Sequence, residues 1–227
     1  MKKFVCVFLA LLCMGIAGAV AEGALTIITK NFLEFDADNT AYFYAKIENT
    51  GDAPTGVGSG KLVGFSAGDD ILVSENYVFT QPNGIVLQPN EYVYAREYVL
   101  ENALKDNDVA DYKFSVETRN YGEEMKRIPC EVMFDLKGAD SYDNYIYVTF
   151  ANDGDSVLYG SYVSVALLDD EENLLFVDGN SYSSLGVHPG STVTVKCYVG
   201  KEFLEHYKAH SLKPTKADAI VFISQDN

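Results

Sequence analysis

The chain has 227 residues and a formal net charge of −16 at pH 7. A surface this acidic repels nucleic acid and anionic lipid, so we expect neither as a partner. Solubility is the simplest consequence of the charge, and attraction to cations or basic partners is the alternative.

Residues 1–21 have the pattern of a secretory signal peptide. A positive start at Lys2 and Lys3 precedes an apolar run over residues 4–20, which ends in Ala19-Val20-Ala21, a small-x-small cleavage sequence. A membrane anchor would need about twenty uninterrupted apolar residues, whereas two glycines interrupt this run. We therefore expect an exported chain, secreted or held at the cell surface, with no membrane span after cleavage.

The cysteines predict one disulfide. Cys6 and Cys13 leave with the signal peptide, so Cys130 and Cys197 remain in the mature chain. A single pair in an exported protein favours a bond between them. Alternation places both cysteines on the apolar faces of their predicted strands, and so in one core. The alternative is two buried, unpaired thiols, because a free cysteine behaves as a small hydrophobic residue.

Two alternating segments surround a tight turn in the second half of the chain. Ile146, Val148 and Phe150 point to one side of a predicted strand, as expected for a strand buried on one face. Asn152-Asp153-Gly154 then ends the run, because Asn, Asp and Gly adopt turn conformations readily. The next predicted strand covers residues 162–168.

The same pattern occurs earlier in the chain. Residues 41–51 align with residues 144–154, and residues 86–90 align with residues 186–190. Short alternating segments separated by turn residues, about ten residues apart, are typical of an all-β sandwich. The expected strands are 25–36, 41–48, 61–66, 71–79, 91–99 and 112–118 in the first copy, and 130–137, 144–151, 161–168, 174–178, 191–199 and 219–224 in the second.

One short helix is expected before the last strand of the second copy. Phe203, Leu204 and Tyr207 have helical spacing within residues 200–211. The joint between the copies falls at residues 120–127, a polar stretch so short that we expect little freedom between the two parts.

The second copy resembles the bacterial FxLYD-type domains and related extracellular immunoglobulin-like modules. The resemblance rests on Asn152-x-Gly154 after an alternating strand, Val163-x-Val165-x-Leu167 followed by Asp169-Asp170, and Pro189-Gly190 before the next strand. The first copy departs from the pattern at residues 65–70, where Phe-Ser-Ala-Gly-Asp-Asp replaces the expected strand end.

This resemblance implies an all-β fold of two tandem immunoglobulin-like antiparallel β-sandwiches, over residues 22–122 and 123–227. It also implies export from a bacterial cell and a non-catalytic surface role. The matched positions are turns and core residues, so no catalytic residue is transferred.

Histidines and acidic clusters are the candidates for metal binding. His206 and His210 lie four apart on the expected helix, but two ligands do not complete a zinc site, and Tyr207 excludes the HExxH motif. The acidic run at residues 169–172 lacks the spaced calcium loop, which favours weak or no calcium binding. The chain also lacks the nucleophile and phosphate-loop motifs. We expect no cofactor, no metal and no enzymatic activity.

A row of tyrosines is the candidate binding surface. If Phe43, Ala45 and Ile47 face the core of the first sandwich, the alternate positions on that strand and on a neighbouring strand face outward. These outward positions are Tyr42, Tyr44, Tyr92, Tyr94 and Tyr98. Such a ladder can simply brace the sheet, at about 0.2–1 kcal/mol for each cross-strand pair, or it can contact an extracellular protein or a glycan.

These observations predict a secreted, non-enzymatic binding or scaffold protein. The alternative is a carbohydrate-recognition module that uses the tyrosine face of the first sandwich. A glycoside hydrolase is a more distant alternative, because no long loops or tryptophans suggest a substrate cleft.

Overall fold

The computed structural model describes residues 22–35, 40–100, 104 and 107–224, so the predicted signal peptide lies outside the described residues. Its elements are the strands β1 (Leu25–Phe35), β2 (Thr40–Asn49), β3 (Thr55–Phe65), β4 (Ile71–Gln81), β5 (Ile85–Leu87), β6 (Tyr92–Leu100), β7 (Asp111–Arg119), β8 (Glu123–Ile128), β9 (Cys130–Leu136), β10 (Asn144–Ala151), β11 (Ser161–Leu168), β12 (Leu174–Tyr182), β13 (Thr192–Tyr198) and β14 (Lys216–Ser224), and the helix α1 (Lys201–Ala209). The fold is all-β and sandwich-like, as expected.

Strands β1 to β7 form the first half of the molecule. One of its sheets has the order β1-β2-β6, and the other has the order β7-β3-β4. Strand β4 belongs to both sheets, because residues 71–78 pair with β3 and residues 79–81 pair with β6. The two sheets enclose Phe43, Ile47 and Leu62, which are fully buried.

Strands β9 to β14 form the second half, in which the same strand order recurs. The order β9-β10-β13 matches β1-β2-β6, and the order β14-β11-β12 matches β7-β3-β4. Ile146, Val148 and Val165 fill the space between these sheets. The inward alternation predicted for the strand at residues 144–151 is present in β10.

Strand β8 joins the two halves. Most of the stretch expected to be a polar linker is in fact a strand, which pairs in parallel with β5 and antiparallel with β14. A hydrogen-bonded path therefore runs from the first half into the second without a break. After Pro129 the chain enters β9 and the other sheet of the second half.

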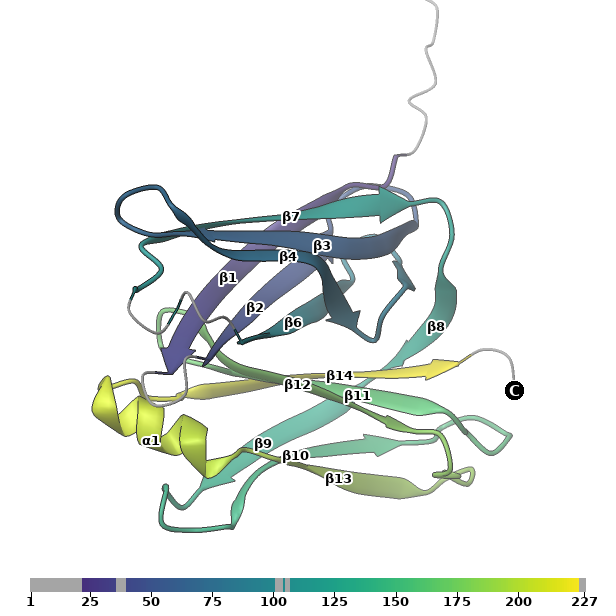
Figure 1. The fold of residues 1–227 in the computed structure, drawn as a ribbon. Helices are drawn as coiled ribbons and strands as arrows, with labels where there is room; N and C mark the ends of the chain where they lie inside the picture. The colour runs from purple at the N-terminus through teal and green to yellow at the C-terminus, as the bar shows by residue number, and fades with distance from the viewer. Residues whose placement is uncertain (1–21, 36–39, 101–103, 105–106, 225–227) are drawn as a thin grey trace, which may run out of the picture.

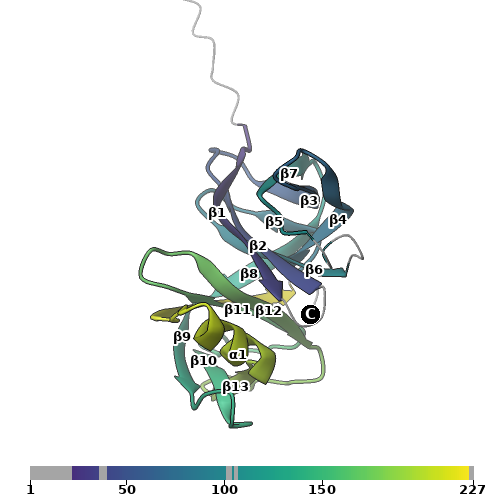
Figure 2. The same ribbon diagram turned by 60° about the vertical axis from the view of Figure 1, so that its left-hand side comes forward.

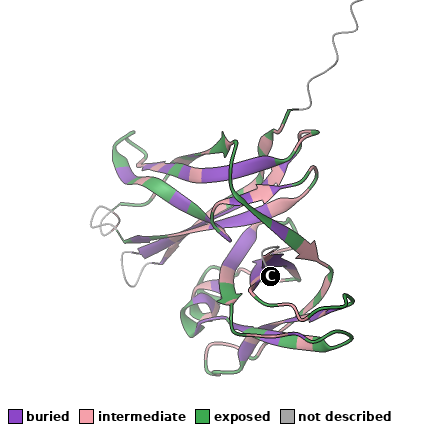
Figure 3. Ribbon diagram, turned by 90° about the vertical axis from the view of Figure 1, so that its right-hand side faces the viewer, coloured by how far each residue is buried: buried purple, intermediate pink, exposed green. Residues whose placement is uncertain are grey.

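The four sheets are stacked as layers (Figure 1). The sheets β1-β2-β6 and β14-β11-β12 face each other in the middle, and the sheets β7-β3-β4 and β9-β10-β13 lie on the outside. Strand β12 contacts β1, β2 and β6 across the boundary. Buried positions occur on the strands of both halves (Figure 3) and form one continuous cluster.

Helix α1 precedes the last strand, β14, and lies near the end of β1 (Figure 2). Its apolar side buries Phe203 and Tyr207. The Tyr207 hydroxyl donates a hydrogen bond of 2.8 Å to the carbonyl oxygen of Leu175, which fixes the helix to β12. No helix among the described residues has the length and apolar character needed to cross a membrane.

Candidate functional site

The predicted tyrosine face lies at the boundary between the two halves. Strands β2 and β6 pair antiparallel, as expected, and Tyr42 lies opposite Tyr98 in their register. Tyr44 and Tyr94, however, have no exposed surface. The expectation that these two residues face solvent is wrong, because the sheet β14-β11-β12 and helix α1 of the second half cover this face.

One carboxylate of the second half binds two of these tyrosines. The hydroxyls of Tyr92 and Tyr94 both donate to Oδ2 of Asp218, and the ammonium of Lys46 lies 3.7 Å from the same oxygen. Burial, reinforced by the Asp218 charge, raises the pKa of both tyrosines well above 10. Both hydroxyls therefore keep their protons and act as donors to Asp218 at any physiological pH.

A second charged contact crosses the boundary. The Arg96 guanidinium donates a hydrogen bond to Asp178 of β12, and its central carbon lies 5.5 Å from the centre of the Tyr42 ring. Nearby, Asn31 donates to the carbonyl oxygen of Leu174 at 2.8 Å. Cations of the first half thus meet acids of the second half, while tyrosine rings fill the space between them.

Aromatic rings close the boundary around α1. Phe203 packs against Phe35 and Tyr42, with ring centres 5.3 and 4.9 Å apart respectively. His206 stacks on Phe35 at 4.4 Å, and the rings of His206 and His210 lie 4.3 Å apart. Both histidines line a cavity of about 380 Å³. Across the residues that the structure describes, no group of three or more side chains is arranged to hold a metal ion.

Part of the predicted face remains accessible. Tyr98 is 47% exposed, at the end of β6 away from Asp218. Two aromatic residues of β4 that the sequence did not single out are also exposed, Tyr77 and Phe79, whose rings stack with centres 6.4 Å apart. Phe79 pairs with Arg96, so these rings extend the aromatic surface beyond the covered part.

The second half carries a similar face that the first half does not cover. In β10 and β13, Tyr145 lies opposite Tyr198 and Tyr147 lies opposite Lys196. These pairs correspond to Tyr42 with Tyr98 and to Tyr44 with Arg96 in the register of β2 and β6. The Lys196 ammonium lies 5.3 Å from the centre of the Tyr145 ring, much as Arg96 lies over Tyr42.

This second face belongs to an outer layer of the stack, so solvent reaches it. Tyr198 of β13 is 42% exposed, and Met133 of β9 is 67% exposed. The rest of the face is polar, because Thr149 pairs with Thr194 through a hydroxyl hydrogen bond of 2.8 Å.

Two buried asparagines occupy equivalent places in the two halves. The Asn49 amide donates to the carbonyl oxygens of Ala53 and Leu87, and its oxygen accepts from the Gly51 nitrogen. The Asn152 amide makes the same bonds to Ser156, Val187 and Gly154. These contacts explain why the two Asn-x-Gly segments align in the sequence. Each asparagine side chain joins its own turn to a second loop of the same half by hydrogen bonds.

The predicted disulfide is not formed, and both Cys130 and Cys197 are free. Cys130 pairs with Phe150, whereas Cys197 pairs with Ile146 on the other side of β10. The two cysteines are therefore four residues apart along the strand direction, which is about 13 Å. They are also two strands apart across the sheet, which is about 10 Å. A disulfide requires Cα atoms within about 7 Å. Alternation placed both cysteines on one face, but it could not give their separation along the strands.

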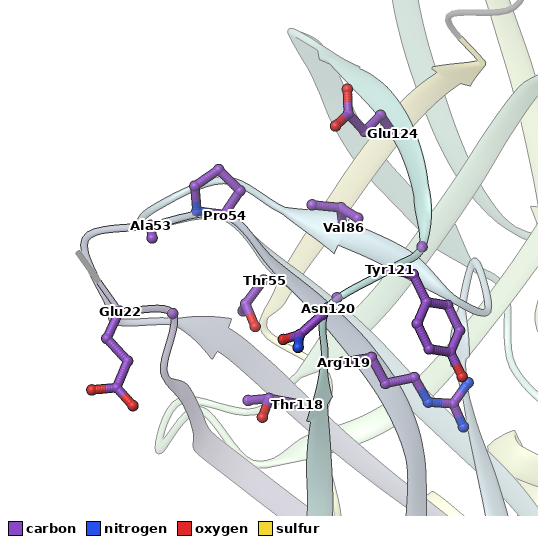
Figure 4. A pocket seen from close by; sticks show the side chains of 13 residues that line it. Glu22, Ala53, Pro54, Thr55, Val86, Thr118, Arg119, Asn120, Tyr121 and Glu124 are labelled. Atoms are coloured by element: carbon purple, nitrogen blue, oxygen red, sulfur yellow. The ribbon is translucent and has the colours of Figure 1, made fainter. Parts of the chain in front are cut away.

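A cavity of about 550 Å³ lies at the end of the first half, near the start of β8 (Figure 4). Thr55 and Asn120 lie at its centre, with Glu22 on one side and Arg119 on the other. The Arg119 guanidinium covers the exposed Tyr121 ring at 5.7 Å. The cavity is open and polar, and nothing in it resembles an activated nucleophile or an acid–base pair.

A scan of protein-family models found no match to the chain, and a search of curated proteins found none either. The FxLYD-type resemblance therefore remains a prediction from the turn and core residues.

Proposed function

We propose that the chain is an exported, non-enzymatic binding or scaffold protein that acts outside a bacterial cell. In this proposal it consists of two immunoglobulin-like modules of the FxLYD type, over residues 22–122 and 123–227. The single observation that carries the proposal is that one of two equivalent tyrosine faces is used to join the modules and the other is exposed.

The joined face supports a scaffold role. Tyr44 and Tyr94 are fully buried between the halves, and Asp218 binds two tyrosine hydroxyls across the boundary. Strand β8 adds backbone hydrogen bonds to both halves. A pair of modules joined in this way holds its outer surfaces at fixed relative positions. A fixed arrangement helps to present a contact surface, whereas two modules that act independently do not need it.

The exposed face supports a binding role. Tyr145, Tyr147 and Tyr198 form a patch with Lys196 at one end of the sheet β9-β10-β13. Tyrosines are enriched at protein interfaces, because their rings supply contact area at low entropic cost. Since Arg96 meets Asp178 at the equivalent place, we propose a protein partner that brings a carboxylate to Lys196.

Carbohydrate recognition is the second candidate. It is supported by the tyrosine face of the second half, and not by that of the first half as the sequence predicted. On the first half, the centre of the tyrosine face is covered, so a glycan cannot reach Tyr44 or Tyr94. On the second half, the rings of Tyr145 and Tyr198 lie 5.8 Å apart at the surface, beside the exposed acid Asp135. Exposed rings with polar neighbours are the chemistry that sugar rings require.

The test compares two double variants of the mature chain. Tyr145→Ala with Tyr147→Ala removes two of the three rings of the aromatic patch, and Thr149→Ala with Thr194→Ala changes the polar end of the same face. Both are applied to a glycan array and to a cross-linking pull-down from the native cell surface. We expect a surface protein that the tyrosine variant loses and the threonine variant keeps. Binding to the array with the same dependence would favour the carbohydrate alternative, and binding unaffected by either variant would contradict both.

A further inference from the structure

Residues 22–24 lie against the loop between β2 and β3. The Thr50 nitrogen donates to the carbonyl oxygen of Ala24 at 2.8 Å, and the Asp52 nitrogen donates to that of Glu22 at 3.1 Å. The Ala24 nitrogen donates in turn to the side-chain oxygen of Asn49 at 3.3 Å. The segment before β1 is therefore held on the loop by hydrogen bonds along its whole described length.

Two glycines permit this close approach. A Cβ at Gly51 would lie 2.2 Å from the carbonyl oxygen of Glu22, and a Cβ at Gly23 would lie 2.4 Å from the Cβ of Thr55. Real side chains do not tolerate contacts this short, so the segment and the loop fit together only without them. The position of the Glu22 nitrogen relative to the loop is fixed as a result.

That nitrogen points at a carboxylate. Glu22 N lies 2.6 Å from Oδ1 of Asp52, a short distance for a bond between a backbone nitrogen and an acid. Glu22 is also the residue that becomes the first of the chain if the predicted signal peptide is cleaved after Ala21. We propose that Asp52 is the binding site for the α-ammonium group that this cleavage creates.

The inference rests on the proposed export, and its chemistry is hydrolysis by a signal-processing protease. Water adds to the Ala21–Glu22 peptide bond, so that Ala21 gains a carboxylate and the Glu22 nitrogen becomes an amine that takes up a proton at neutral pH. A single N–H donor to Asp52 thereby becomes a cation paired with it. Capture of a chain's N-terminal amine by a folded surface is a known recognition mode.

The neighbouring charges favour a cation at this place. The Glu22 side chain lies on one side of the adjoining cavity, and Arg119, Tyr121 and Glu124 lie on the other (Figure 4). Asp52 and the Glu22 side chain are thus closer to the end of the chain than the Arg119 guanidinium is. A net acidic setting stabilises an ammonium group and raises its pKa.

The second half provides a matched control. Asp155 follows Asn152-x-Gly154 as Asp52 follows Asn49-x-Gly51, so the two acids occupy the same position in equivalent turns. Asp155 is exposed, and the chain that enters the second half is the continuous segment from β8 to β9, without a terminus. An effect that requires the chain end should therefore appear at Asp52 and not at Asp155.

The test uses the chain 22–227, released with Glu22 as its first residue by a tag-cleaving protease, so that it does not depend on export. NMR titration of the ¹³C-methylated α-amine measures its pKa, which is usually about 7.7–8.0. We expect a raised pKa in the wild type and in Asp155→Asn, and a fall of about half a unit or more in Asp52→Asn. The same pKa in all three proteins would overturn the inference.

A thermal measurement adds a second readout. The Asp52→Asn change should lower the melting temperature of the chain that begins at Glu22 by about 1–3 °C, as expected for an exposed ion pair. An added residue before Glu22 should remove most of that difference. N-terminal sequencing of the exported protein tests the cleavage separately: a first residue other than Glu22 would contradict the physiological role, whereas a titration without a shift would contradict the ion pair itself.

Discussion

The side-chain amide of Asn49 makes the same three hydrogen bonds in the first half as that of Asn152 makes in the second. Both asparagines are buried, and each joins its own turn to the loop before the next strand. The residues that follow these loops agree as well, since Asn90 and Gly190 both have positive φ, at 66° and 72°. This correspondence is the strongest structural sign of duplication within the chain.

Replacing either asparagine should destabilise the protein by a similar amount. Asn49→Ala and Asn152→Ala each remove these three hydrogen bonds, of which the one to the carbonyl oxygen of Leu87 or Val187 is buried. We therefore expect a loss of about 2–4 kcal/mol in the free energy of unfolding. Urea denaturation measures both losses. Thr149→Ala, at the surface of β10, is the control and should change stability by less than about 1 kcal/mol. A large loss at one asparagine only would show that the two turns are not equivalent.

Two neighbouring tyrosines at the boundary should respond oppositely to the removal of their hydroxyls. The Tyr94 hydroxyl donates to Asp218, whereas the buried Tyr44 hydroxyl has no hydrogen-bond partner among the described residues. Tyr94→Phe should therefore lower the free energy of unfolding by about 1–3 kcal/mol, and Tyr44→Phe should leave it unchanged or raise it. Thermal denaturation of both variants measures the difference. Equal losses would indicate that Tyr44 also forms a hydrogen bond in solution.

The two cysteines should react as free thiols of unequal accessibility. Burial raises the pKa of the Cys197 thiol to about 11, and burial also raises the pKa of the half-buried Cys130 thiol. Thiolate is the reactive form, so both should react slowly at pH 8 in the folded protein, Cys197 more slowly than Cys130. Mass spectrometry after timed alkylation should show this order. After the mature chain is unfolded without reductant, two thiols should titrate. If no thiol titrated, the two cysteines would form the predicted disulfide after all.

Glu97 should make stability depend on pH. Burial, and then the charge of Glu75, raise the pKa of Glu97 above its usual value. A carboxyl whose pKa is raised by folding is protonated more easily in the folded state. Its contribution to stability is therefore present below its unfolded pKa and is lost as pH rises through its folded pKa.

Glu97→Gln removes the charge that is unfavourable at neutral pH. The variant should melt at a higher temperature than the wild type at pH 7, and this advantage should disappear on acidification below the pKa of Glu97. Glu131→Gln, at an exposed position of β9, is the control for the loss of one negative charge. A pH-independent difference would mean that the carboxyl does not titrate in the way its surroundings indicate.

Alternation in the sequence predicted the strands and the direction of their side chains. It placed Phe43 and Ile47 inward and Tyr44 outward, and the structure agrees about the faces of the sheet. It could not predict that another sheet covers the outward side of Tyr44, because a period of two residues describes one strand and not what lies against it.

Other features lacked a local signal. Strand β8 is mostly polar, and its pairing with β5 and β14 depends on segments far away in the sequence. Strand β5 has three residues, too few for a pattern to appear. The contact of Asp218 with two tyrosines depends in the same way on the packing of the halves, so no spacing in the sequence could indicate it.

The central claim is that the tyrosine boundary and β8 hold the two halves as one body. Residual dipolar couplings of backbone amides, measured for β1–β7 and for β9–β14 in one alignment medium, test it most directly. We expect both sets to fit a single alignment tensor with the halves placed as in Figure 1. Tensors that differ in magnitude or direction would contradict the claim, because they would show that the halves move independently or pack differently in solution.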